Sequence, residues 1–145
     1  MKIETIETSR LLLRGFSKED AMWAYRIWND PQVGQYLPDE AKEGIDYEYL
    51  KQLEVLGEGE KVYDIAYCVH KKFWGNGYAT EIAQGLIGYA RRKGAEKVTI
   101  YVNQENIASN CVARKCGGKI VSESTYKKRG TDQIMKDYKY EVTLS

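Results

Sequence analysis

The alternation of apolar and polar residues in the middle of the chain predicts a strand, a helix and a second strand. Lys61–Val69 (KVYDIAYCV) is rich in β-branched and aromatic residues, which favour strands. From Tyr78 to Lys93 apolar residues recur three, four and seven positions apart, which predicts an amphipathic helix, and Gly94 suits the position just past its end. Lys97–Val102 (KVTIYV) predicts another strand. This order of elements is typical of a β-α-β unit.

Further elements are predicted before and after this unit. Arg10–Phe16 is a short apolar run that predicts a strand. Ser17 suits the position before a helix, with Asp20 three residues later as in a capping box, and this helix extends to about Asn29. Residues 44–57 predict a second helix. After the unit, the chain predicts a short helix over 106–117 and strands over 119–124 and 137–144.

Composition narrows the class of protein. The 145 residues suffice for a single domain, 1–145, with one core. A formal net charge of +1 favours neither nucleic acid nor an acidic membrane as a partner, and no apolar run is long enough to span a bilayer. The start of the chain, MKIETIETSR, lacks the apolar core of a secretory signal. The three cysteines show no metal-site spacing, and a single histidine excludes a histidine-rich metal site. We therefore expect a cytoplasmic protein without a metal site.

The turn between the first predicted strand of the unit and its helix has the sequence HKKFWGNGYATE, His70–Glu81. A glycine-containing turn before a helix presents free backbone N–H groups, and the helix dipole adds partial positive charge there. Gly75 and Gly77 would let a phosphate group approach the main chain with no Cβ in the way. The alternative is an ordinary strand-to-helix turn with solvated lysines. The dinucleotide spacing G-x-G-x-x-G is absent, because its third position is Thr80.

A second polar segment follows the second strand of the unit. In NQENIASNCVARKCGG, Asn106 and Ser109 lie three residues apart at the start of the short helix. Both side chains could reach polar groups at the open end of the preceding strand. Alternatively, Asn106 is only the helix cap and Ser109 only a residue of the first turn.

Taken together, these segments resemble the GNAT acetyltransferase superfamily. YDIAYCVHKKFWGNGYATE is similar to its acetyl-CoA motif, in which an Arg/Gln-x-x-Gly-x-Gly/Ala loop follows a strand, and NIASNCVARKCGG is similar to its second motif. The opening TSRLLLRGFSKEDA, with WNDPQV and YLP, resembles the ribosomal-protein N-acetyltransferase branch. The resemblance implies an α/β fold with a mixed, mostly antiparallel sheet and helices on both faces.

The chain departs from the family pattern at three motif positions and in one longer segment. Lys72 stands at the Arg/Gln position, Gly118 at the final Phe, and Ala113 where many members have a general-acid tyrosine. The family's second and third strands have no counterpart, since only GEGEK joins Leu56 to Val62. Either the protein lacks these strands, or the natural chain has a segment that this sequence does not contain. We favour the second explanation, because the loss would expose the edge of a sheet.

The resemblance also implies how acetyl-CoA is held. Backbone N–H groups from Phe73 to Ala79 would bind the pyrophosphate, and Tyr67–Val69 would diverge from Val98–Val102 so that the pantetheine arm pairs with the open edge. Asn106 would hold the arm, and a backbone N–H near Val69 would face the developing oxyanion. The implied acetyl-CoA contacts are Tyr67, Cys68, Val69, Lys72, Phe73, Trp74, Gly75, Asn76, Gly77, Tyr78, Ala79, Asn106, Ser109 and Lys115.

Two residues are candidates for proton transfer. Asp64 matches the acidic residue of the branch's EIGY-type strand and is the candidate base, acting directly or through water; the alternative is a salt-bridged strand residue. Ser109 could protonate the leaving thiolate, or serve only as cap and cofactor contact. We weigh less heavily an acyl-enzyme formed on Cys68 and a catalytic base at His70. The identity of the general acid stays open.

The resulting expectation is an N-acetyltransferase (an acyltransferase) that transfers acetyl from acetyl-CoA to a primary amine by direct attack in a ternary complex. We favour the α-amine of a peptide or protein, because its pKa of about 8 leaves roughly a tenth of it neutral at pH 7, whereas a lysine amine has a pKa of about 10.4. The alternatives are a small-molecule amine acetyltransferase, acting on an aminoglycoside or polyamine, and an acyl-CoA-binding module without turnover. The expected partners are acetyl-CoA and an amine acceptor, and a homodimer is compatible with the sequence.

Overall fold

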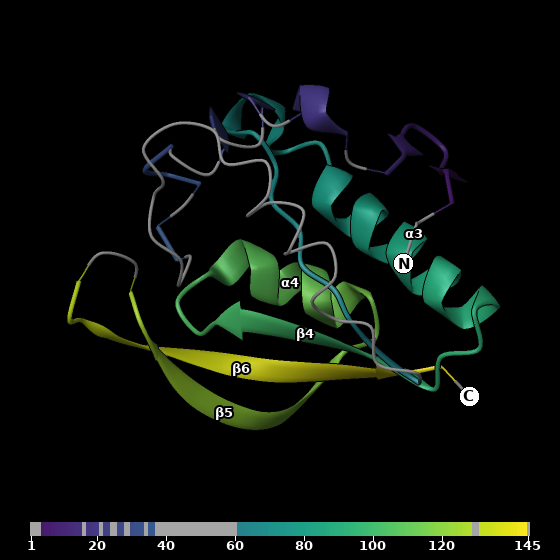
Figure 1. Ribbon diagram of the computed structural model, residues 1–145. Coiled ribbons are helices and arrows are strands. Elements are labelled where there is room, and N and C mark those ends of the chain that lie inside the picture. Colours follow the sequence, from purple (N-terminus) through teal and green to yellow (C-terminus); the bar gives the residue numbers. More distant parts are fainter. Residues whose placement is uncertain are drawn as a thin grey trace.

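The computed structural model describes residues 4–15, 17–20, 22–23, 26–27, 30–33, 35–36, 61–128 and 131–144. Its main sheet has the strand order β3-β4-β6-β5 (Figure 1). The bounds are β3 (Val62–Asp64), β4 (Lys97–Asn103), β5 (Lys119–Lys127) and β6 (Ile134–Thr143). β3 and β4 are parallel, while β6 is antiparallel to both β4 and β5. The predicted mixed, mostly antiparallel sheet is therefore confirmed.

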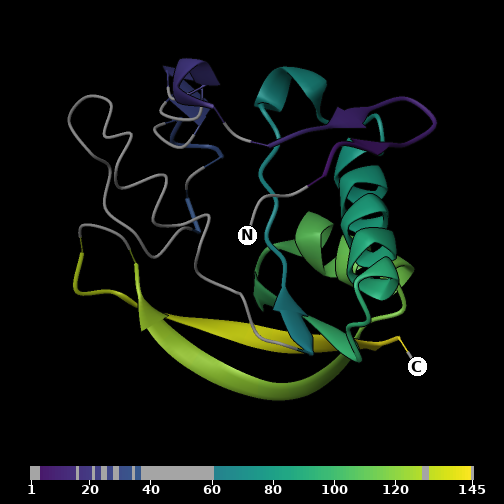
Figure 2. The same ribbon diagram turned by 45° about the vertical axis from the view of Figure 1, so that its right-hand side comes forward.

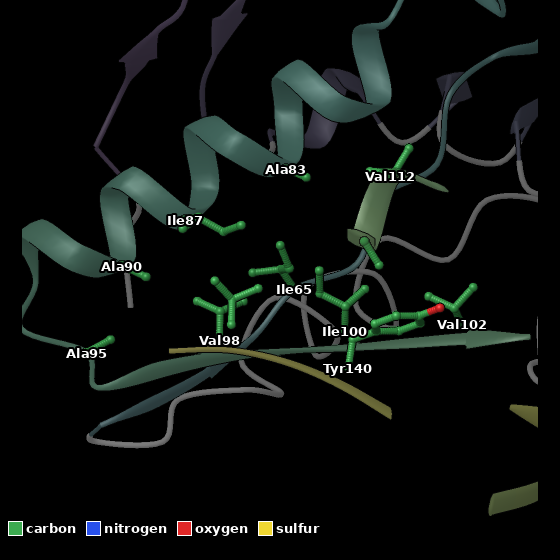
Figure 3. Packing of buried hydrophobic residues seen from close by; sticks show 12 residues of the cluster. Ile65, Ala83, Ile87, Ala90, Ala95, Val98, Ile100, Val102, Val112 and Tyr140 are labelled. Carbon is green, nitrogen blue, oxygen red and sulfur yellow. The ribbon is translucent and has the colours of Figure 1, made fainter. Parts of the chain in front are cut away.

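Two helices cover the same face of this sheet (Figures 1 and 2). These are α3 (Tyr78–Arg92) and α4 (Ile107–Lys115). The apolar stripe of α3 faces the sheet and buries Ala83, Ile87 and Ala90, as its spacing predicts. Figure 3 shows these side chains packed over Val98, Ile100, Val102 and Tyr140 of the central strands. No helix in the described ranges has the length and apolar character needed to cross a membrane.

The N-terminal part of the chain differs from the prediction. The predicted strand Arg10–Phe16 is instead one arm of a small antiparallel hairpin, β1 (Ile6–Glu7) and β2 (Leu12–Leu13), which packs on α3. A turn closed by the Thr8 N–H and the Leu11 carbonyl, 2.9 Å apart, makes the strands short.

The first predicted helix is described only in part. It contains the 3-10 helix η1 (Lys18–Asp20), and Asp20 accepts the Ser17 N–H at 2.9 Å, as the predicted capping box requires. The second predicted helix, 44–57, lies outside the described residues, as does most of the segment GEGEK.

Three strand boundaries also differ. The predicted strand Lys61–Val69 keeps strand pairing only as β3, because the chain then leaves β4. β5 continues to Lys127 and β6 begins already at Ile134, because the two strands stay paired almost to their connecting loop. β5 is exposed along almost its whole length, so its end shows no alternation of buried and exposed residues that a pattern analysis could detect.

The departure at Gly118 has a packing reason. The Gly118 N–H donates to the Ala113 carbonyl at 2.9 Å, so the chain turns tightly back after α4. A Cβ at Gly118 would lie 2.8 Å from that carbonyl oxygen and 3.3 Å from Tyr140, whose side chain is buried beneath it. The larger residue that the family pattern has at this position therefore does not fit here without rearrangement.

We expect Gly118→Ala to destabilise the protein by about 1–3 kcal/mol, the usual cost of overpacking. Gly88→Ala is the matched control, because it lies inside α3 and its added Cβ would meet nothing nearer than Arg92 Nη1 at 3.7 Å. That substitution should stabilise the helix by about 0.5–1 kcal/mol. Urea unfolding of the two variants measures both effects. A Gly118→Ala variant as stable as the parent would show that the Ala113 carbonyl can shift away from the added Cβ at little cost in stability.

Candidate functional site

The site begins where the chain leaves the sheet after β3. The Ile65 N–H donates to the Thr99 carbonyl at 3.0 Å, and beyond this bond the chain no longer pairs with β4, which continues to Asn103. Figure 2 shows this segment rising away from β4. Within the described residues, no other strand pairs with β4 on this side. The expected divergence at Tyr67–Val69 is present, and it leaves room for an extended ligand to pair with the main chain as an added strand would.

The turn that follows is tied together by its own side chains. The Trp74 indole N–H donates to the Val69 carbonyl at 2.8 Å. The Asn76 amide donates to the carbonyls of Phe73 and Trp74, at 3.0 and 3.2 Å. These bonds occupy main-chain carbonyls and fix the shape of the turn. Trp74 and Asn76, both predicted as cofactor contacts, thus hold the loop with the polar groups of their side chains.

Two glycines bring the chain from this turn into α3 with left-handed backbone angles. Gly75 has φ +80° and Gly77 has φ +77°, which residues with a Cβ adopt only at a cost. Gly77 is the N-cap of α3 and has no side chain to cap the helix. Helix geometry leaves the N–H groups of the first turn, at Tyr78 and Ala79, without partners inside the helix. Together with the helix dipole, these groups suit an anion.

Arg10 stands beside this helix start, and the sequence analysis missed it. Its Nε donates to a carboxylate oxygen of Glu81 at 2.7 Å and its backbone N–H to the other oxygen at 2.9 Å. The Thr8 hydroxyl donates to the same carboxylate, and these bonds lower the pKa of Glu81. The guanidinium lies 4.7 Å from the centre of the Tyr78 ring. A contact across 71 residues leaves no local pattern by which it could have been found.

The start of α4 meets the diverging segment through two hydroxyl groups. Asn106 caps the helix by accepting the Ser109 N–H at 3.1 Å, so the capping interpretation of Asn106 holds. The Tyr67 hydroxyl lies 3.1 Å from the Ser109 hydroxyl and 3.3 Å from the Ser109 carbonyl oxygen. Burial raises the pKa of Tyr67, so its hydroxyl stays protonated at neutral pH. Tyr67 therefore links the segment to the helix and brings a proton donor to Ser109.

Asp64 lies on the other face of the sheet. Tyr63 packs against the core, so the next side chain along the strand points away from the helices. Asp64 accepts the Thr99 hydroxyl at 2.8 Å. Partial desolvation raises the pKa of the carboxyl group, opposed by the Thr99 hydrogen bond and by the charge of Lys139. No ion pair of Asp64 occurs among the described residues, so a salt bridge does not explain it.

The two weaker catalytic hypotheses gain no support from the geometry. Burial raises the pKa of the Cys68 thiol to about 11, so little nucleophilic thiolate exists at neutral pH. His70 Nδ1 accepts the Lys72 N–H at 3.1 Å and thereby caps the 3-10 helix η2 (Lys71–Phe73). Its ring packs edge-on against Phe73.

The remaining predicted contacts are basic and exposed. Lys72 lies over the Phe73 ring, while its neighbour Lys71 pairs with Asp30 at 3.1 Å. Lys115 is in the last turn of α4, the opposite end of that helix from Asn106. In the part of the chain that the structure describes, no three histidine, cysteine or acidic residues gather as a metal site would require.

Comparison with known proteins agrees with this geometry. Residues 52–119 match the model of the acetyltransferase (GNAT) domain family. A relative from Bacillus subtilis, the uncharacterized N-acetyltransferase YnaD, is 26% identical over 137 aligned positions, covering 77% of this chain and 81% of the relative.

Two solved structures share the fold. A GNAT-family acetyltransferase from Bacillus anthracis superposes with a TM-score of 0.74 at 22% identity, over 97% of this chain and 99% of that one. YncA from Salmonella typhimurium, solved with its cofactor acetyl-CoA, has a TM-score of 0.70 at 15% identity and covers 90% and 91%. Over residues 52–119 the chain is thus similar to the acetyltransferase (GNAT) domain, and it shares the fold of solved acetyltransferases, one of them in complex with acetyl-CoA.

Proposed function

We propose that the protein acetylates the α-amine of a peptide or protein, by direct attack of the amine on acetyl-CoA in a ternary complex. The observation that carries the proposal is the divergence of Tyr67–Val69 from β4, which leads directly into the Gly75–Gly77 turn and the start of α3. An edge for an extended arm and a site for an anion thus follow one another along the chain. The pantetheine and pyrophosphate of acetyl-CoA occur in the same order.

In this proposal the N–H groups at the start of α3 bind the pyrophosphate. A backbone N–H near Val69 stabilises the oxyanion that forms as the amine attacks the thioester. Ser109 then protonates the departing thiolate, with Tyr67 as the neighbouring donor. A tyrosine hydroxyl is a better acid than an aliphatic hydroxyl, although burial raises the pKa of Tyr67 above its ordinary value.

Asp64 removes the proton of the amine through water. An aspartate side chain is one methylene group shorter than that of the usual glutamate, which favours a water molecule between its carboxylate and the amine. Its raised pKa makes the carboxylate a stronger base than an ordinary aspartate. An α-amine needs only this modest assistance, because roughly a tenth of it is neutral at pH 7.

The face around Asp64 supports an α-amine more than a polyamine. The positive charge of Lys139 acts to lower the pKa of Asp64. On the same face, Lys97 Nζ lies 3.5 Å from Glu141 Oε2. These lysines would repel a polycation more than a single α-amine. The resemblance of TSRLLLRGFSKEDA to the ribosomal-protein branch points to the same acceptor class.

The acceptor proposal is tested by measuring free thiol release from acetyl-CoA with a panel of peptides, polyamines and aminoglycosides. Turnover should be fastest with a peptide that has a free α-amine and should stop when that amine is blocked. Turnover only with polyamines or aminoglycosides would contradict the acceptor class. Binding of acetyl-CoA without turnover on any amine would indicate a binding module instead.

Gly77→Ala should weaken CoA binding more than tenfold, a loss of about 1.4 kcal/mol or more, because its Cβ would project toward the bound phosphates. Gly94→Ala is the matched control: it has a similar φ of +83° at the far end of α3, with nothing within 4 Å of the added Cβ. Both variants pay the same backbone strain, so they should lose similar stability. Calorimetric titration with CoA separates them, and equal affinities would exclude the turn as the phosphate site.

Asp64→Asn should lower the rate about 10²- to 10⁴-fold and leave CoA affinity unchanged. The loss should shrink as pH rises, because the acceptor then deprotonates without help. Loss of a structural ion pair would lower the stability of the variant, whereas Asp64→Asn should leave it unchanged or raise it. Since the folded state raises the Asp64 pKa, ionised Asp64 costs stability once the pH exceeds the unfolded pKa.

The Asn variant should therefore melt at the same or a higher temperature at pH 7, and the difference should vanish in acid. Asp137→Asn is the control, because it makes the same change of charge on β6 of the same sheet, and it should keep normal kinetics. Parallel pH–rate profiles of kcat/KM for Asp64→Asn and the parent would remove Asp64 from the mechanism.

Ser109→Ala and Tyr67→Phe should each lower kcat by about tenfold or more while CoA affinity stays nearly constant. If the two hydroxyls act as one unit, the double variant should be little slower than either single one. Steady-state kinetics with the best peptide acceptor provide the comparison. Fully additive losses would mean that the hydroxyls act independently, and unchanged kcat in both would leave protonation to solvent.

A further inference from the structure

Arg10 is held at the start of α3 by contacts that fix one side of its guanidinium. Nε and the backbone N–H both bind the Glu81 carboxylate, and the guanidinium lies against the Tyr78 ring. In the described part of the chain, the terminal nitrogens Nη1 and Nη2 donate no hydrogen bond. A guanidinium has five N–H donors, so the Glu81 contact leaves four of them on the terminal nitrogens.

One of those terminal nitrogens, Nη2, lies beside the glycine turn. A Cβ built on Gly77 would lie 3.4 Å from Arg10 Nη2, so the space beside the turn that glycine leaves open is bordered by this nitrogen. On the other side, a Cβ on Gly75 would meet nothing within 4 Å. An anion on the turn would thus touch backbone N–H groups and, on one side, a fixed guanidinium.

The charges around the turn make Arg10 the best-placed cation. Lys71 uses its single ammonium group in an ion pair with Asp30, whereas Arg10 pairs with Glu81 through Nε and keeps its terminal nitrogens. Lys72, at the family's Arg/Gln position, lies over the exposed Phe73 ring. A guanidinium binds phosphate through two parallel hydrogen bonds, whereas a lysine acts as a point charge. The Glu81 carboxylate stays ionised and its charge offsets that of Arg10, so Arg10 would bind an anion chiefly through hydrogen bonds from its terminal nitrogens.

We propose that Arg10 of the N-terminal hairpin binds the diphosphate of the acyl donor and so selects CoA thioesters over pantetheine thioesters that lack the diphosphate. This inference rests on the proposed acetyl transfer from CoA. Arg10 supplies from outside the motif the planar cation that Lys72 does not provide. Because Glu81 holds Arg10, the docking of the β1–β2 hairpin on α3 also positions the donor.

The first test measures CoA binding by calorimetry, which needs no acceptor. Arg10→Ala should bind CoA about 10- to 100-fold more weakly, and Arg10→Lys should recover only part of the loss. Arg92→Ala is the matched control, since Arg92 lies near an aromatic ring, Tyr89, at the other end of α3. It removes the same charge and should bind CoA normally. Equal affinity of Arg10→Ala and Arg92→Ala for CoA would overturn the inference.

The second test identifies the phosphate group and separates binding from a merely structural role. The Arg10→Ala defect in donor KM should be the same with acetyl-CoA and with 3′-dephospho-acetyl-CoA, and should disappear with S-acetylpantetheine. A defect lost with the dephospho donor would move Arg10 to the 3′-phosphate and overturn the assignment. A defect that persists with S-acetylpantetheine would show a structural role only. If the parent protein binds no CoA, the proposed function itself fails.

Discussion

The end of strand pairing after Ile65 is the constraint on which the site depends. One more pair of residues in the β3–β4 ladder would close the edge that an extended ligand needs, and would carry the glycine turn away from its place above the sheet. Beyond the end of the β3–β4 ladder, the Tyr67 hydroxyl holds the segment in place through its contacts with the hydroxyl and the carbonyl oxygen of Ser109. Packing of α3 and α4 on one face then aligns the helix starts with the opening.

The candidate donor-binding groups and the candidate base lie on opposite faces of the sheet. Groups suited to the donor lie on the helix side, where dipoles and left-handed glycines gather anion-binding N–H groups. Asp64 lies on the opposite side, in a polar setting with Thr99 and Lys139. An amine that approaches from that side would meet the thioester through the opening between β3 and β4. Donor and acceptor would then not compete for one entrance, which suits a ternary complex.

Local patterns predicted the local parts of this arrangement. The α3 stripe, the cap at Asn106 and the glycine turn each depend on residues within one or two helical turns, so the sequence contains the necessary signal. Arg10 was missed because its partner Glu81 is distant in the chain, and the shortness of β3 was missed because pairing depends on a neighbouring strand. The end of β5 was missed because the strand is exposed almost throughout and so has no alternating burial pattern. At Gly118 the motif comparison found a departure, which the positions of the Ala113 carbonyl and of Tyr140 explain.

Apart from Arg10, the donor half of the site lies between Tyr67 and Ser109, a stretch that contains η2, α3, β4 and the start of α4. Contacts between residues close in the chain cost little loop entropy and form quickly during folding. The contact of Tyr67 with Ser109 and the pairing of β4 with β6 instead join segments about forty residues apart. We therefore expect α3 and α4, which are held by local contacts, to form before these contacts complete the site. A nucleotide-bearing ligand would then act on the folding pathway as well as on the finished enzyme.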